Sequence, residues 1–114
     1  MSEKAETGRK IQELQFLEQN AQNLLLQKQT FQVQLNELQN ALAELSRSSN
    51  EVYKILGGIM VRSAKDVLIK ELTEKKKVLE LRIQAIEKQE KIIDDKSRKI
   101  RTDVTGALQD RKNK

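Results

Sequence analysis

The sequence contains no Cys, His, Pro or Trp, and aromatic residues make up only 3% of its 114 positions. Without Cys there is no disulfide framework and no thiol chemistry. Without His as well, the commonest general base, nucleophile and metal ligands are missing. We therefore expect no enzyme, no metal site and no cofactor. The lack of Pro, together with 34% charged residues, is typical of long helices and coiled coils.

Long apolar runs are absent too. No segment approaches the about 20 apolar residues of a membrane-spanning helix, and the polar N-terminal residues lack the apolar core of a signal peptide. We expect a cytoplasmic protein with no membrane partner.

The net charge of +5 is unevenly distributed. Residues 1–46 carry four Lys/Arg against six Asp/Glu, a net −2, whereas residues 47–114 carry eighteen against eleven, a net +7. A basic half can indicate nucleic-acid binding. Here Glu and Asp are interleaved with the cations and aromatic side chains for stacking are scarce, which disfavours nucleic acid as a partner. A basic nucleic-acid-binding architectural protein remains one alternative.

Two seven-residue repeats of apolar residues flank the middle of the chain. The first predicts a helix over residues 8–46, with Leu14, Ala21, Lys28, Leu35 and Leu42 at one heptad position and Leu17, Leu24, Phe31, Leu38 and Leu45 at the other. The second predicts a helix over residues 63–110, with Leu72, Leu79, Ile86, Ile93, Ile100 and Ala107 at one position and Ile69, Lys76, Ile83, Glu90, Ser97 and Val104 at the other. We expect residues 111–114 to form a charged tail after this helix.

The helical pattern stops at residues 51–62, where two apolar, β-branched runs flank Gly57-Gly58. Such a sequence predicts a β-hairpin, because the turns that match strand twist need positive φ, which glycine adopts without strain. Two-residue pairing places Leu56 opposite Ile59 and Ile55 opposite Met60.

Neither face of this hairpin is polar, and an isolated two-stranded hairpin is marginal in water. The sequence offers no further strand, so the missing strands must come from other chains. We interpret the hairpin as an assembly element built from Val52, Tyr53, Ile55, Leu56, Gly57, Ile59, Met60 and Val61. The alternative is a connector that folds back onto its own two helices.

Two long helices joined by a short connection are expected to fold back antiparallel. Lys28 then lies within a turn of Glu90, where the two charges can pair, or Lys28 can extend along its aliphatic stem to solvent. Both termini come together at the end opposite the hairpin. Phe16, Ile92 and Leu108 fall off the seam there, either as incidental exposure or as a binding surface.

The hairpin and the helix after it carry a family resemblance. VYKILGGIMVRSAKDVLIKELTEKKKVLELRIQAIEKQE, which begins at Val52, resembles the beta-class subunit of prefoldin, the hexameric cochaperone of archaea and eukaryotes. Val52-Tyr53-Lys54, Gly57 and the following apolar-apolar-Val-Arg run are its most specific marks. The likeness covers roughly residues 8–110 and is closer to archaeal than to eukaryotic members.

The resemblance implies a single prefoldin-like domain over residues 1–114. Hairpins from two alpha-class and four beta-class subunits would form an intersubunit β-barrel, and the coiled-coil tips would hold non-native polypeptide clients and deliver them to a group II chaperonin without ATP. The tip residues would be Ile11, Leu14, Phe16, Leu17, Ile100, Val104 and Leu108. A structural coiled-coil scaffold is the second alternative.

Overall fold

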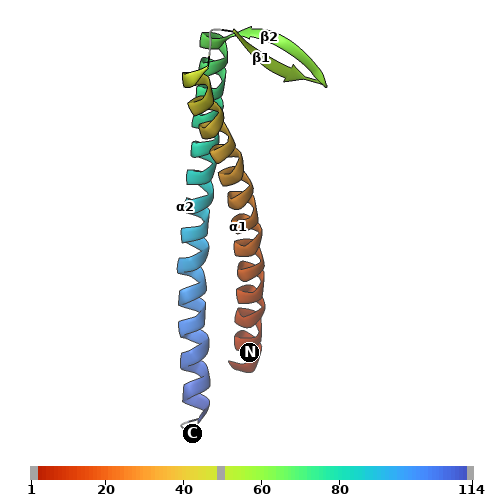
Figure 1. The fold of residues 1–114 in the computed structure, drawn as a ribbon. Coiled ribbons are helices and arrows are strands. Elements are labelled where there is room, and N and C mark those ends of the chain that lie inside the picture. Colours follow the sequence, from red (N-terminus) through yellow and green to blue (C-terminus); the bar gives the residue numbers. More distant parts are fainter. Residues whose placement is uncertain (1–2, 49–50, 113–114) are drawn as a thin grey trace. The chain divides into compact units, whose positions relative to one another are not determined.

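The structure, a computed structural model, describes residues 3–48 and 51–112; residues 1–2, 49–50 and 113–114 lie outside it, as do several side chains of residues 51–63 and 110–112. The chain forms a long helix α1 (Glu3–Arg47), strands β1 (Glu51–Leu56) and β2 (Ile59–Ala64), and a second long helix α2 (Lys65–Lys112) (Figure 1). Two long helices with a central hairpin confirm the predicted mainly α fold.

Helix α1 begins at Glu3, five residues before the predicted start. Glu3 and Glu6 lie in its first turn, where carboxylates interact favourably with the helix dipole. The Thr7 hydroxyl donates a 2.8 Å hydrogen bond to the Glu3 carbonyl, and Thr7 is only 7% exposed. Thr7 lies seven residues before Leu14, so the seam extends one repeat further towards the N-terminus than the apolar residues alone indicated.

The two heptad repeats define the buried seam, as predicted. Every residue assigned to them above is buried or half-buried. The most buried apolar side chains are Leu17, Leu45, Leu79, Ile83 and Ile86. Ser97 is also buried, so the seam beyond Glu90 includes a polar residue.

Helix α1 ends at Arg47, one residue after the predicted end at residue 46. The Ser46 hydroxyl donates to the Ala43 carbonyl, and both the amide and the hydroxyl of Ser48 donate to the Leu45 carbonyl. These bonds satisfy carbonyl groups that the last helical turn leaves without a partner.

Strands β1 and β2 form an antiparallel pair with the predicted register, Leu56 opposite Ile59 and Ile55 opposite Met60. Gly57 and Gly58 have φ of 54° and 83°, the positive values that a tight hairpin turn needs at both central positions. The pairing continues to Glu51 opposite Ala64. Because this ladder includes residues 63 and 64, α2 begins at Lys65, two residues later than predicted.

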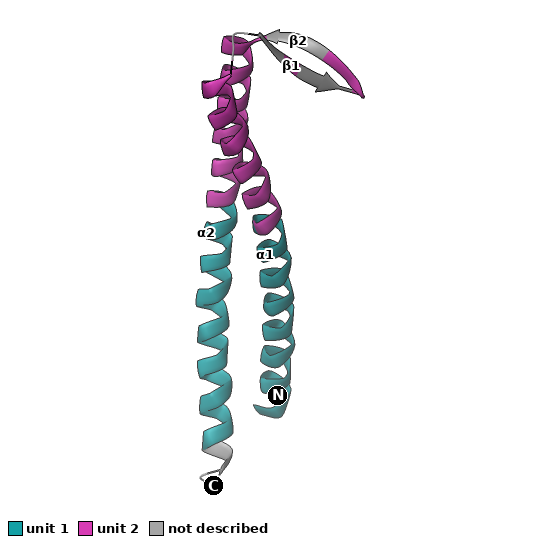
Figure 2. Ribbon diagram, viewed as in Figure 1, with its two compact units in different colours: residues 1–28, 85–114 teal, residues 29–84 magenta. Residues whose placement is uncertain are grey.

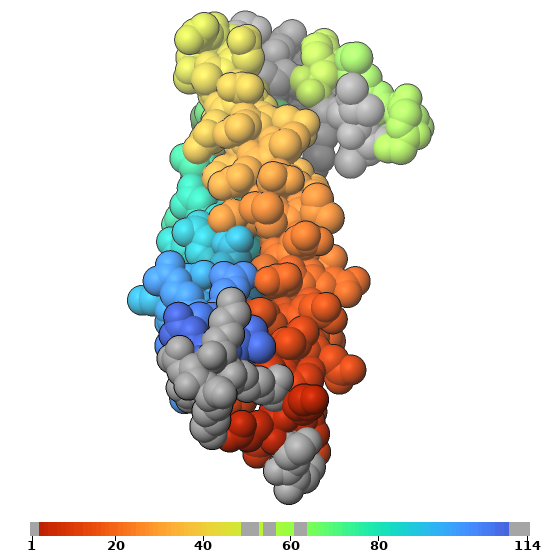
Figure 3. Space-filling model, turned by 90° about the horizontal axis from the view of Figure 1, so that it is seen from below, coloured from red at the N-terminus to blue at the C-terminus, as the bar shows by residue number. Residues whose placement is uncertain are grey.

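The chain divides into two compact units (Figure 2). Unit 1 contains residues 1–28 and 85–114, and unit 2 contains residues 29–84. In each unit a segment of α1 runs antiparallel beside a segment of α2 (Figure 1). The space-filling view shows the red N-terminal and blue C-terminal segments of unit 1 meeting side by side (Figure 3). Unit 2 also contains the hairpin.

Candidate functional site

The described apolar side chains of the hairpin are open to solvent. Tyr53 is 57% exposed, Ile59 68% and Met60 65%. The helices of unit 2 therefore do not cover them, which argues against a connector folded back onto its own helices. Gly57 is also exposed. The side chains of the other predicted assembly residues, Val52, Ile55, Leu56 and Val61, lie outside the described residues.

An ion pair crosses the seam of unit 1. The Lys28 Nζ donates to Glu90 Oε1 at 2.9 Å, and the two side chains are 22% and 25% exposed. The structure thus confirms the pairing of the two seam charges over the alternative in which Lys28 extends to solvent. The hydrogen bond that Lys28 donates to Glu90 raises the pKa of Lys28 above its ordinary 10.5, desolvation opposes this, and Coulomb attraction to Glu90 and Glu87 reinforces it.

This pair predicts a pH dependence of stability at alkaline pH. Because folding raises the pKa of Lys28, the ion pair contributes its full stabilisation at pH values below the pKa of Lys28 in the unfolded chain. This contribution is lost as pH rises through the pKa of Lys28 in the folded chain, above about pH 10.5. We expect Glu90→Gln to remove most of this dependence. Circular dichroism melts from about pH 9 to pH 12 should therefore show Tm falling more steeply in the wild type.

Asp94→Asn is the matched control, since it also changes a carboxylate to an amide. Asp94 pairs with Arg98 at 3.0 Å, and arginine stays charged throughout this range. Its alkaline Tm slope should equal that of the wild type. Equal slopes in Glu90→Gln and the wild type would contradict the role given to the pair.

Unit 1 also contains the end of the helix pair at which both termini lie (Figure 1). Three of the residues predicted for client binding are exposed there: Phe16 (65%), Leu108 (46%) and Ile11 (40%). The other four belong to the seam: Leu17 is buried, and Leu14, Ile100 and Val104 are half-buried. Ile92, off the seam as predicted, is 54% exposed.

Several cations of the basic second half have carboxylate partners. Lys75 pairs with Glu71 and Lys76 with Glu80 along the same helix, and Arg101 pairs with Glu18 of α1 at 3.0 Å. Pairing of this kind reduces the positive field available to a polyanion. The arrangement agrees with a solvated helix face.

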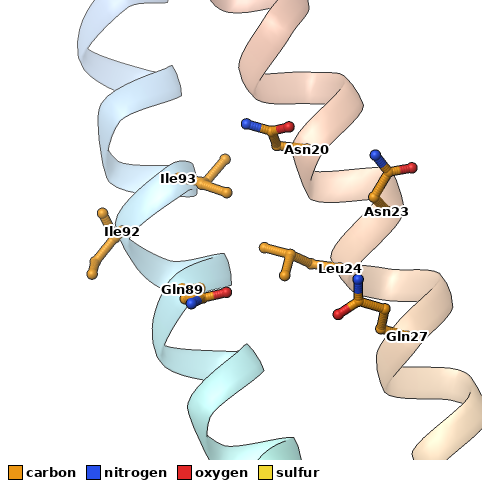
Figure 4. Close-up of a pocket in the computed structure, with 7 residues that line it drawn as sticks. All are labelled: Asn20, Asn23, Leu24, Gln27, Gln89, Ile92 and Ile93. Carbon is orange, nitrogen blue, oxygen red and sulfur yellow. The ribbon is translucent and has the colours of Figure 1, made fainter.

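Two grooves run along the helix pairs. In unit 2, a groove of 730 Å³ is lined by charged side chains as well as apolar ones: Gln34, Glu37, Leu38, Ala41, Glu71, Glu74, Lys75, Val78, Leu79 and Arg82. In unit 1, a groove of 380 Å³ is lined by Asn20, Asn23, Leu24, Gln27, Gln89, Ile92 and Ile93 (Figure 4).

The amide side chains of the unit 1 groove were not among the predicted site residues. A signal for them exists in the sequence, because positions that flank the seam of a coiled coil often carry Glu or Lys. Glu13, directly before Leu14, is a charged residue of this kind. The residues directly before the next three members of the same heptad position are instead uncharged amides, namely Asn20, Gln27 and Gln34.

In the described part of the chain, no group of three or more Asp or Glu is placed to hold a metal ion. Neither helix contains, among its described residues, a stretch apolar enough to cross a membrane.

Comparison with known proteins identifies the family. The profile of a family described as prefoldin subunit matches residues 9–111. The chain belongs to the prefoldin family. Among its relatives, the prefoldin subunit beta of Methanospirillum hungatei is 34% identical over 104 residues, which cover 90% of this chain and 87% of the relative. That of Archaeoglobus fulgidus is 39% identical over 82 residues, which cover 70% and 71%.

A solved prefoldin structure has the same fold. The crystal structure of the prefoldin beta subunit from Thermococcus strain KS-1 superposes with a TM-score of 0.86 at 32% identity, and the alignment covers 90% of this chain and 92% of that one. The resemblance to archaeal beta-class prefoldin subunits, first seen in the hairpin and its flanking helix, is thereby confirmed over nearly the whole chain.

Proposed function

We propose that this prefoldin subunit holds non-native polypeptide through apolar side chains at the terminal end of unit 1. The observation that carries the proposal is the exposure of Ile11, Phe16 and Leu108 in the part of unit 1 that contains both ends of the chain. Exposed apolar side chains at this end favour contact with apolar segments of another chain. Unfolded polypeptide is the partner that always presents such segments.

The hairpin supports the second part of the proposal, a hetero-oligomer of two alpha-class and four beta-class subunits. Tyr53, Ile59 and Met60 are more than half exposed, and strands from neighbouring subunits would both bury these side chains and pair the free strand edges. The assembly would act in the cytoplasm, hold clients by burial of apolar surface alone, and pass them to a group II chaperonin without catalytic chemistry or ATP.

The contribution of Phe16 can be tested directly. We expect Phe16→Ser to weaken the binding of reduced, carboxymethylated α-lactalbumin, a client that stays unfolded, by about tenfold. Burying the exposed Phe16 ring against the client contributes roughly 1–2 kcal/mol to the binding free energy. Helix stability should change by less than about 0.5 kcal/mol, since Phe16 lies off the seam. Fluorescence anisotropy titrations at low and high salt measure the affinity.

Val33→Ser is the control, because Val33 is also an off-seam apolar residue of α1 and is 57% exposed, but lies in unit 2. Its affinity for the client should equal that of the wild type. Binding by apolar burial should persist in high salt, whereas binding to DNA would fall steeply. Tight, salt-sensitive DNA binding that ignores Phe16→Ser, without client binding at any salt, would refute the proposal.

A further inference from the structure

The groove in unit 1 has an unusual lining for a chain in which 34% of the residues are charged. We call it the amide groove: Asn20, Asn23, Gln27 and Gln89 supply four side-chain amides, and Leu24, Ile92 and Ile93 supply apolar surface. No charged residue lines it, whereas the groove in unit 2 is lined by three glutamates, a lysine and an arginine. Leu24 and Ile93 point toward one another across the amide groove (Figure 4).

The four amides have unused hydrogen-bonding capacity. In the described part of the chain, none of these side chains forms a hydrogen bond with another residue. Each offers two donors and one acceptor oxygen, the same group types as a peptide backbone. Asn20 and Gln27 are seven residues apart, about 10.5 Å along a helix. About three residues of an extended chain span this distance, so one short segment can reach both amides.

The amide groove continues the surface proposed to hold clients. Phe16, Asn20, Asn23 and Gln27 follow one another at intervals of four, three and four residues, which places them in one stripe on α1. The exposed Phe16 thus begins a stripe that leads into the groove. Across the groove, Ile92 of α2 adds apolar surface that is 54% exposed.

We propose that the amide groove binds an extended, uncharged segment of non-native polypeptide, whose backbone hydrogen-bonds to the amides and whose apolar side chains contact Leu24, Ile92 and Ile93. The inference rests on the proposed function and adds the class of segment that is held. Charge complementarity favours this occupant. Hydrogen bonds between the side-chain amides and a neutral backbone can replace the hydration that both lose, whereas a charged segment would give up hydration there without an opposite charge.

The first test changes the charge of the groove while keeping its shape. The probe is a short fluorescent peptide of alternating valine and serine, titrated against the full chain assembled with an alpha-class partner. We expect Asn23→Asp with Gln27→Glu to weaken its binding about tenfold, because two amide donors are lost and two carboxylates are left without partners. Gln19→Glu with Gln22→Glu adds the same charge on exposed positions of the same helix and should change affinity less than about twofold.

The second test asks what the amides contact. A peptide with the same side chains but N-methylated backbone amides cannot donate backbone hydrogen bonds, and should bind the wild type about fivefold more weakly. Photo-cross-linking from Asn23→p-benzoylphenylalanine should yield an adduct with the peptide.

Equal affinities for the two peptides, equal effects of the groove and control variants, or adducts only with a second copy of this chain would overturn the inference. The α-lactalbumin titration distinguishes failure of the groove inference from failure of the proposed function. If the wild type binds that client and the groove variant binds it equally well, only the groove inference fails. If the wild type binds neither the client nor the peptide, the proposed function fails with it.

Discussion

Replacing Ile59 and Met60 together with aspartate is expected to dissociate the assembly while leaving the helical circular dichroism nearly unchanged. The two residues are neighbours on β2 and therefore belong to opposite faces of the hairpin. Burying each is worth about 1.5–3 kcal/mol, and a carboxylate buried in its place without a partner costs several kcal/mol more. Since both side chains are mostly exposed within the single chain, their loss should leave the helix pair intact.

Light scattering coupled to size-exclusion chromatography, with the alpha-class partner present, measures this outcome. Val33→Asp with Leu81→Asp is the matched control, because these residues are 57% and 64% exposed on the helices of unit 2. The control should keep the mass of the wild-type assembly. An unchanged mass in the hairpin variant would show that assembly depends on another surface.

The second large effect is expected in the seam. Ile86 is 6% exposed, so Ile86→Ala should lower the free energy of unfolding by about 2–5 kcal/mol through lost burial and the cavity left behind. That is a large share of the stability of a chain of this size. Urea denaturation followed by circular dichroism at 222 nm measures the change.

Ile92→Ala makes the same chemical change further along the same helix. Ile92 is 54% exposed, so its removal should change stability by less than about 0.5 kcal/mol. Comparable losses in the two variants would mean that the seam does not supply most of the stability.

The seam and the hairpin could be predicted from the sequence because both depend on strict local rules. A helix turns by a fixed angle per residue, so Leu17, Ile83 and Ile86 had to share the seam once the seven-residue period was recognised. A two-residue turn fixes the pairing of every residue beside it, so Gly57-Gly58 determined that Leu56 lies opposite Ile59.

Other features of the structure depend on contacts that the seven-residue repeat of apolar residues does not predict. Helix α1 extends to Glu3 because Thr7, a polar residue, occupies a seam position. Helix α2 begins at Lys65 rather than at the predicted residue 63, because the strand ladder continues past the apolar residues to Ala64. The amide groove was not predicted because the uncharged amides before the seam positions of α1 do not indicate which residues of α2 lie beside them.

The most direct test of the proposed function is the suppression of client aggregation. The wild-type chain, assembled with an alpha-class partner, is mixed with a chemically denatured enzyme diluted out of guanidinium, without ATP, and turbidity is followed. We expect about one wild-type assembly per client to prevent most of the aggregation, at low and high salt alike, and several times more of the Phe16→Ser assembly to be needed. Aggregation that proceeds unchanged in a several-fold excess of correctly assembled wild-type protein would contradict it.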